Sequence, residues 1–345
     1  MILRDEYFME RCFHLAKNGF GHVSPNPMVG CVLVYEDKII GEGFHQMFGS
    51  PHAEPTAIAN VQNPTLLSKS TLYVNLEPCS HFGKTPPCAD LIIEKGIKNV
   101  VVCNLDPNPL VSGKGVRKLQ ESGINVRVGI SEAKGKDLNK RFFTFMTKKR
   151  PYIILKWAQT LDGFMDIDRE EKPLENYWIT NNRLKTFVHK WRAEEDAIMV
   201  GTNTIRNDNP LLTTREWVGK NPIRITIDKV LGLPKTSHFF NSEAKTFVYN
   251  FKQDNTTENV SYIKVDSFNV LQGVLSDLYQ RGVQSVIVEG GYVLLSSFIS
   301  LNLWDEARVL VGNKVFMKGL NAPVLVSSPE SVFSVDEDDI LFYRN

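Results

Sequence analysis

The feature that most constrains this chain is a His-x-Glu sequence followed by two Pro-Cys pairs. His52 and Glu54 are separated by one residue, and Cys79 and Cys88 each follow a proline. One imidazole and two thiolates form a ligand set for a catalytic zinc, which leaves the fourth tetrahedral position open for water. Glu54 need not bind the metal and is placed to carry a proton. The fold must therefore bring three segments together around one metal ion.

This pattern indicates a zinc-dependent nucleobase deaminase, for which H-x-E followed by P-C-x-x-C is typical. Here eight residues, 80–87, separate the two cysteines in place of two. A structural zinc is the alternative, and it would need a fourth protein ligand, for which His45 and His81 are the neighbouring candidates. In the catalytic interpretation, zinc lowers the pKa of its water toward ~7 and the hydroxide attacks an amine-bearing ring carbon. Glu54 then passes the proton to the leaving ammonia.

The size and charge of the chain favour a two-domain enzyme that acts on a small molecule. The chain has 345 residues, which is long for one domain, and its net charge of +1 gives no reason to expect nucleic acid or an anionic membrane as a partner. No apolar run reaches the roughly 18 residues of a membrane span, and the charged N-terminal segment does not resemble a secretory signal. We therefore expect a cytoplasmic protein. Cys12, Cys31 and Cys103 lie in apolar runs and are expected to be buried free thiols.

Alternating apolar patterns predict an α/β fold in both halves. In the first half the order α-β-β-α-β-α-β-α-β predicts one five-stranded sheet with helices on both faces, and both zinc segments fall at helix starts. A connecting helix is expected over residues 131–149, and the domain boundary over 148–151. The second half begins with a buried strand after Pro151 and again alternates strands and helices, so a mostly parallel sheet with antiparallel last strands is expected.

Three segments of the first half resemble the deaminase half of the bifunctional riboflavin-biosynthesis deaminase/reductase family, which also has an eight-residue gap between the cysteines. Four segments of the second half resemble the reductase half. The first set is GFGHVSPNPMVGCVLV, GFHQMFGSPHAE and LYVNLEPCSHFGKTPPCADLII; the second is LKWAQTLDG, YWITN, HKWRAEEDAIMVGTNTIRNDNPLLTTR and VIVEGGYVLLSSF.

The resemblance implies a cytidine-deaminase-like α/β/α domain over residues 1–147 and a dihydrofolate-reductase-like α/β domain over 148–345. It implies zinc and NADPH as cofactors, a phosphoribosylamino pyrimidine as the small-molecule substrate, and a homo-oligomer. Asn26 and His45 match substrate positions of the deaminase. From the residues alone, a turn-capping role is favoured for Asn26 in its Pro-flanked loop, and a solvated loop residue is the alternative for His45. The positions matched in the reductase are Thr160, Trp178, Thr204, Asp208, Gly290, Gly291 and Tyr292 for the cofactor, and Lys156, Asn176, Arg192, Leu212, Arg215 and Glu289 for the substrate.

The residue types in the second half are compatible with these roles. Arg192 and Arg215 are suited to bidentate phosphate binding, with surface ion pairing as the alternative. Lys156 lies inside an apolar strand, where a charge needs a partner. The segment 164–177 is acidic and longer than usual for the family, and Asn176 stands where a Ser is expected. The rival functions are a nucleic-acid base deaminase and a binding module that has lost catalysis.

Overall fold

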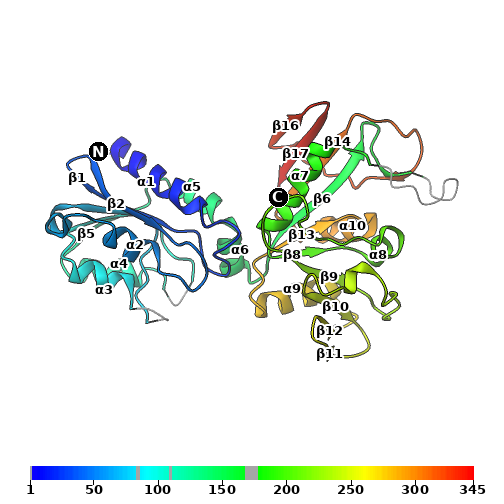
Figure 1. Cartoon of the computed structure of the whole chain (residues 1–345), viewed down its shortest axis with the longest axis horizontal. Helices are drawn as coiled ribbons and strands as arrows, with labels where there is room; N and C mark the ends of the chain where they lie inside the picture. Colours follow the sequence, from blue (N-terminus) through cyan, green and yellow to red (C-terminus); the bar gives the residue numbers. More distant parts are fainter. Residues whose placement is uncertain (1, 83–85, 109–110, 168–177) are drawn as a thin grey trace. The chain divides into compact units, whose positions relative to one another are not determined.

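The computed structural model describes residues 2–82, 86–108, 111–167 and 178–345 (Figure 1). The chain divides into two compact units, Met1–Lys149 and Arg150–Asn345. Within the described residues, none of the helices combines the length and apolarity that a membrane crossing requires.

The first unit is built on one five-stranded sheet, as the sequence predicted, and the strand order in it is β2-β1-β3-β4-β5. Strand β1 pairs antiparallel with both β2 and β3, whereas β3, β4 and β5 run parallel. The carboxyl ends of β3 and β4 therefore meet at the same edge of the sheet, where side chains from the following loops can gather. The strands are β1 (Gly30–Tyr35), β2 (Lys38–Phe44), β3 (Thr71–Leu76), β4 (Asn99–Asn104) and β5 (Asn125–Val128).

Helices cover both faces of this sheet, because alternate residues of each strand are apolar on opposite sides. On β3, Leu72 packs toward the face covered by α2, α3 and α4, whereas Tyr73 packs toward α1. Cys12, Cys31 and Cys103 are fully buried free thiols, which confirms that prediction. The helices of the two layers are α1 (Ile2–Lys17), α2 (Ala53–Ala59), α3 (Cys88–Glu94) and α4 (Lys114–Glu121).

The prediction of a single connecting helix over residues 131–149 is wrong. The segment forms two helices, α5 (Glu132–Leu138) and α6 (Lys140–Lys148). The helix breaks at Asn139, which is buried and has non-helical dihedral angles. The Asn139 side chain accepts a hydrogen bond from Met28 N at 2.8 Å and donates one to Met28 O at 2.9 Å. These bonds give hydrogen-bond partners to the main-chain N–H and C=O of Met28 in the loop before β1, and they favour two helices over one continuous helix.

The second unit contains a ten-stranded sheet with the order β11-β12-β10-β9-β8-β13-β6-β14-β17-β16. The seven strands from β12 to β14 in this order run parallel to one another. At one side of the sheet β17 and β16 add antiparallel pairs, and at the other β11 pairs antiparallel with β12. This confirms the expected mostly parallel sheet; the short strands β7, β11, β15 and β16 were not expected. The strands are β6 (Tyr152–Thr160), β7 (Phe164–Asp166), β8 (Ala197–Met199), β9 (Ile223–Ile227), β10 (Thr246–Asn250), β11 (Asn255–Thr256), β12 (Val260–Lys264), β13 (Ser285–Glu289), β14 (Glu306–Gly312), β15 (Leu320–Asn321), β16 (Ser331–Val335) and β17 (Asp338–Arg344).

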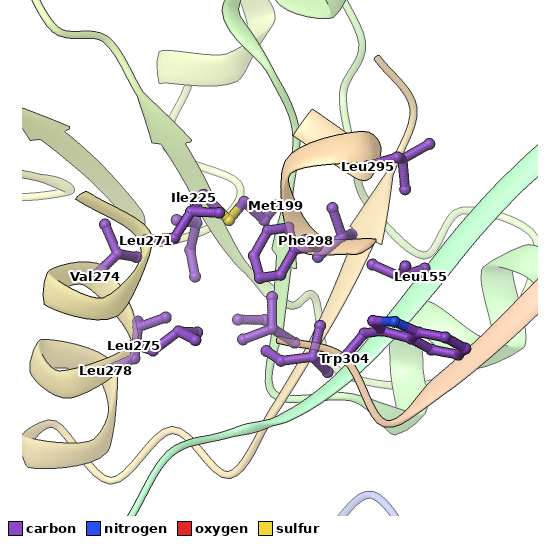
Figure 2. Close-up of a cluster of buried hydrophobic side chains, with 14 of the residues drawn as sticks. Leu155, Met199, Ile225, Leu271, Val274, Leu275, Leu278, Leu295, Phe298 and Trp304 are labelled. Atoms are coloured by element: carbon purple, nitrogen blue, oxygen red, sulfur yellow. The ribbon is translucent and has the colours of Figure 1, made fainter. Parts of the chain in front are cut away.

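One face of this sheet packs against α9 and α10, as Figure 2 shows. Leu275 and Leu278 of α9 and Phe298 of α10 are buried against strand residues such as Met199 and Ile225. The opposite face is covered by α7, whose Leu184, Val188 and Trp191 belong to a separate core cluster. The helices of this unit are α7 (Asn182–Glu194), α8 (Thr202–Asp208), α9 (Val270–Gln280) and α10 (Tyr292–Ser300).

Candidate active sites

The first unit brings the three predicted metal ligands together. His52 is the N-cap of α2, Cys79 follows β3, and Cys88 is the first residue of α3. His52 Nδ1 lies 3.7 Å from Cys79 Sγ and 3.3 Å from Cys88 Sγ, and all three ligand atoms lie within 4.8 Å of one another. Among the described residues, no fourth His, Cys, Asp or Glu joins this group.

The donor set and its spacing fit zinc. With Zn–S near 2.3 Å and Zn–N near 2.0 Å, two ligands of one tetrahedral ion are about 3.5 Å apart. The two observed N···S separations, 3.7 and 3.3 Å, lie on either side of that value. Thiolates also favour zinc over magnesium or calcium. Three ligands leave one position for water, which is the arrangement of a catalytic and not of a structural site.

The electrostatics of the two cysteines suit metal binding. A hydrogen bond from Cys88, together with His52, lowers the pKa of Cys79 to about 4. The same hydrogen bond and burial raise the pKa of Cys88, since two adjacent thiolates repel each other. Cys79 Sγ also accepts the main-chain N–H of Cys88 at 3.3 Å, which holds the two ligand segments together. A bound cation removes the repulsion and allows both thiols to ionise.

Glu54 is buried next to these ligands in the first turn of α2, with 3% of its surface exposed. Burial, followed by the neighbouring Cys79, raises the pKa of Glu54 to about 7. The positive charge of a metal ion would favour the carboxylate. A carboxyl group with a pKa close to neutral can both accept and return a proton, which is the property that a general acid/base requires.

Asn26 and His45, the two predicted substrate-binding residues, contact each other beside His52. The His45 ring is buried and donates through Nδ1 to Pro51 O at 3.0 Å, so that Nε2 accepts from Asn26 Nδ2 at 3.0 Å. The His45 and His52 rings meet edge to face with centroids 5.5 Å apart. With both ring nitrogens engaged, His45 does not close the metal site as a fourth ligand, and burial lowers the pKa of its ring and favours the neutral form.

Two carboxylates near the metal ligands, the buried Glu77 and the half-buried Asp106, were not singled out from the sequence. Glu77 follows β3 directly and Asp106 follows β4. Burial raises the pKa of Asp106 to about 6, and the charges of Glu77, His81 and Cys79 also act on it. The signal that could have found them is the strand order, because the carboxyl ends of parallel neighbours gather at one edge.

In the second unit, Lys156, Arg192 and Glu289 form a buried ionic cluster. Glu289 and Lys156 are register partners on the parallel strands β13 and β6, with Oε2 and Nζ 3.7 Å apart. Arg192 of α7 donates to Glu289 through Nε at 2.9 Å and Nη2 at 2.7 Å. Burial lowers the pKa of Lys156. Burial alone would raise the pKa of Glu289, but Arg192 and Lys156 lower it to about 2.

This cluster differs from the expectation for Arg192. The sequence suggested either a phosphate ligand or a surface ion pair with nearby acidic residues. The guanidinium group of Arg192 instead binds Glu289 through Nε and Nη2, and Arg192 Nη1 donates to Thr213 O at 3.4 Å. Arg215 is exposed and donates to Thr213 Oγ1 at 3.1 Å, and the buried Leu212 lies next to these residues with a positive φ of 56°. Of the two arginines, Arg215 is therefore the one whose position suits an anionic group.

The residues predicted to contact the cofactor are partly brought together by the β13–α10 turn. Gly290 and Gly291 have φ values of 69° and 76°, which L side chains rarely adopt, and Thr204 Oγ1 lies 3.3 Å from the position that a Gly291 Cβ would occupy. Tyr292 begins α10 and is 41% exposed. The free N–H groups of a helix start and an adjacent hydroxyl fit a phosphate-bearing nucleotide such as NADPH. Asp208 ends α8, the helix that carries Thr204.

The other predicted cofactor and substrate residues are less closely connected. The Thr160 hydroxyl donates to Asp162 Oδ1 at 2.6 Å and accepts from Phe164 N at 3.0 Å, so it holds the turn between β6 and β7. Trp178 is 60% exposed, and Lys185 Nζ lies 5.1 Å from the centroid of its ring. Asn176 lies outside the described residues, as does most of the acidic segment 164–177.

Comparisons with known proteins find the same relatives for both units. The cytidine and deoxycytidylate deaminase zinc-binding region matches residues 3–104, and the RibD C-terminal domain matches residues 151–333. The riboflavin biosynthesis protein RibD of Aquifex aeolicus is 42% identical over 99% of this chain and 98% of its own length. That of Bacillus amyloliquefaciens is 38% identical, with 94% and 88% covered.

Solved structures give the same result. The crystal structure of a diaminohydroxyphosphoribosylaminopyrimidine deaminase/5-amino-6-(5-phosphoribosylamino)uracil reductase from Thermotoga maritima has a TM-score of 0.87 and 40% identity, with 99% of each chain covered. RibD of Acinetobacter baumannii is similar with a TM-score of 0.87 and 32% identity, again over 99% of each chain.

Proposed function

Because the chain belongs to the family of riboflavin biosynthesis protein RibD, we propose that residues 1–147 form its deaminase domain and residues 148–345 its reductase domain. The two compact units, which divide after Lys149, support this boundary. The first has the cytidine-deaminase-like α/β/α fold and the second the dihydrofolate-reductase-like α/β fold.

The chain is a bifunctional enzyme of riboflavin biosynthesis. With zinc, it hydrolytically deaminates a diamino-(phosphoribosylamino)pyrimidinone to 5-amino-6-(5-phosphoribosylamino)uracil; with NADPH, it then reduces the ribosyl side chain to ribityl. This function replaces the two rivals, a nucleic-acid base deaminase and a binding module without activity. The observation that carries the deaminase assignment is the meeting of His52, Cys79 and Cys88 beside buried Glu54.

For the deaminase, we propose that His52, Cys79 and Cys88 hold zinc, which supplies a Lewis acid that activates water at neutral pH. Glu54 takes a proton from the water and delivers it to the leaving amine, and its burial beside the ligands supports this role. Asn26 binds the pyrimidine edge, oriented by the hydrogen bond that its amide donates to His45.

For the reductase, we propose that Thr160, Trp178, Thr204, Asp208 and the Gly290–Tyr292 turn bind NADPH, which supplies the hydride. The Gly-Gly turn beside Thr204 supports this placement. Lys156, Asn176, Arg192, Leu212, Arg215 and Glu289 face the substrate. Among them, the Lys156–Glu289–Arg192 cluster is held rigidly by its own ion pairs, whereas exposed Arg215 is free to approach the ribose phosphate. We further propose that the chain forms a homo-oligomer, which the family resemblance supports. We also propose that it is located in the cytoplasm, which its composition supports.

Removal of zinc tests the assignment of the first unit. Treatment with a chelator such as dipicolinate should abolish ammonia release from the diaminopyrimidinone. Added Zn²⁺ should restore it and Mg²⁺ should not, because two thiolates select the softer metal. NADPH oxidation with the deaminated intermediate should be unchanged in the same sample and serves as the control. Loss of both activities on chelation, or full deamination by metal-free protein, would contradict the proposed zinc role.

A further inference from the structure

The carboxylate of Glu77 accepts four main-chain hydrogen bonds from one segment of the first unit. Its Oε2 accepts from Asp106 N at 3.1 Å and Gly113 N at 2.9 Å, and its Oε1 accepts from Gly115 N at 2.9 Å and Val116 N at 3.1 Å. Only 4% of Glu77 is exposed. A carboxylate offers four lone-pair positions, so this group is fully used by the loop after β4 and the first turn of α4.

Glu77 also stands directly before the segment that carries a metal ligand. Pro78 and Cys79 follow it, and the start of α4 lies so close that a Cβ at Gly115 would be 2.0 Å from Pro78 O. Beyond Pro78, Cys79 O accepts from Ala89 N at 3.1 Å and Cys79 Sγ accepts from Cys88 N at 3.3 Å. One continuous set of contacts therefore runs from α4 through Glu77 to both cysteine ligands.

We propose that Glu77 is a positioning residue of the metal centre: by holding the main chain at Asp106 and at residues 113–116 against the segment that begins with Pro78, it sets the place of the Cys79 sulfur. Among the described residues, the Glu77 carboxylate accepts hydrogen bonds from main-chain N–H groups and not from the side chains of His52, Cys79 or Cys88. This inference rests on the zinc role proposed above. It adds that the buried carboxylate is required for metal affinity as well as for the fold, because supporting residues keep ligands within a few tenths of an ångström of the binding geometry.

The substitution Glu77→Gln tests this with little change in shape. The amide oxygen can keep two of the four hydrogen bonds, but the amide NH2 would face the other two N–H donors. Loss of a supporting partner typically costs about 10- to 100-fold in metal affinity or activity, and we expect a loss in this range for zinc affinity and for the kcat of deamination. Glu77→Asp keeps the charge but is shorter by one methylene, and an intermediate loss of about tenfold is expected.

Asp5→Asn is the matched control. Asp5 is also a buried carboxylate of the first unit, and it accepts from Tyr73 and Arg127 on the face of the sheet opposite α2 and α3. Each full-length variant would be compared with wild type for zinc affinity by competition with a chromogenic chelator, for kcat and KM of deamination, and for the urea midpoint of zinc release. Asp5→Asn should lower the urea midpoint while leaving zinc affinity and kcat within about twofold.

The outcomes separate the inference from the zinc role on which it rests. Weaker zinc binding in folded Glu77→Gln, with normal binding in Asp5→Asn, supports the inference. Wild-type zinc affinity and kcat in Glu77→Gln, with only a lower urea midpoint, overturns it. If Glu77→Gln does not fold, Glu77→Asp decides: a tenfold loss supports the inference and wild-type affinity overturns it. If wild type itself binds no zinc, the proposed function fails first.

Discussion

Glu54→Gln should abolish deamination while leaving zinc binding and reduction intact. The amide occupies the same volume but cannot carry a proton from water to the leaving amine, so kcat for ammonia release should fall by about 10²- to 10⁴-fold. Zinc content should remain at the wild-type level, because the three side chains proposed to hold the metal are His52, Cys79 and Cys88, and Glu54 is not among them. The variant should also oxidise NADPH normally with the deaminated intermediate, since reduction belongs to the other compact unit.

Glu121→Gln is the matched control for this result. Glu121 is an exposed glutamate at the end of α4 in the same unit, and its replacement should change neither activity. Metal analysis, ammonia release and NADPH absorbance on the same preparations give the three readouts. Ammonia release by Glu54→Gln at the wild-type rate would show that another group moves the proton. Loss of zinc with loss of activity would instead assign Glu54 a role in metal binding.

Glu289→Gln should destabilise the second unit and stop reduction. The substitution leaves Lys156 and Arg192 buried side by side without their shared carboxylate, and removal of one partner from a buried ion pair costs about 3 kcal/mol or more. All five tryptophans lie between residues 150 and 345, so tryptophan fluorescence in urea reports on this unit alone. Deamination should persist, because the zinc ligands belong to the other unit.

The loss of stability in Glu289→Gln should depend on pH, because the pKa of Glu289 is lowered in the folded protein. Arg192 and Lys156 hold its pKa at about 2, whereas the ordinary value is 4.5. A group with a depressed folded pKa contributes stability above its unfolded pKa and loses that contribution as the pH falls toward the folded pKa. The difference in unfolding free energy between wild type and Glu289→Gln should be constant near pH 7 and shrink by about 1 kcal/mol by pH 3.5.

The exposed Glu258→Gln substitution controls for acid effects on the unit as a whole, and it should match wild type throughout. A difference between wild type and Glu289→Gln that stays constant down to pH 3.5 would show that Glu289 does not depend on its cationic partners. A negligible difference at pH 7 would mean that the cluster contributes no stability.

The proximity of His52, Cys79 and Cys88 was predictable because each of the three residues is marked by a local sequence pattern. His52 and Cys88 lie at helix starts and Cys79 follows a strand, and the sequence pattern predicted these element boundaries together with the ligand spacing. Glu54 follows from its position two residues after His52. The same local patterns predicted both sheets, whose long strands are apolar and clearly bounded.

Interactions between distant segments were not predictable in this way. Arg192 and Glu289 are 97 positions apart, and the sequence suggested a phosphate ligand for Arg192, with a local surface ion pair as the alternative. The break at Asn139 depends on its hydrogen bond with the main-chain N–H of Met28, which lies 111 positions earlier in the sequence. The four groups that donate hydrogen bonds to Glu77 are main-chain N–H groups, and no pattern of side chains in the sequence identifies them.

The most direct test of the central claim is a two-step assay with the purified chain and the phosphoribosylamino diaminopyrimidinone. Ammonia release and NADPH oxidation would be followed in one reaction, with NADPH present from the start. We predict that ammonia appears first, that NADPH is oxidised after a lag, and that Glu54→Gln oxidises NADPH only when the deaminated intermediate is supplied. Oxidation of NADPH without prior ammonia release, or ammonia release with no NADPH oxidation at any time, would contradict a single chain that performs both steps in this order.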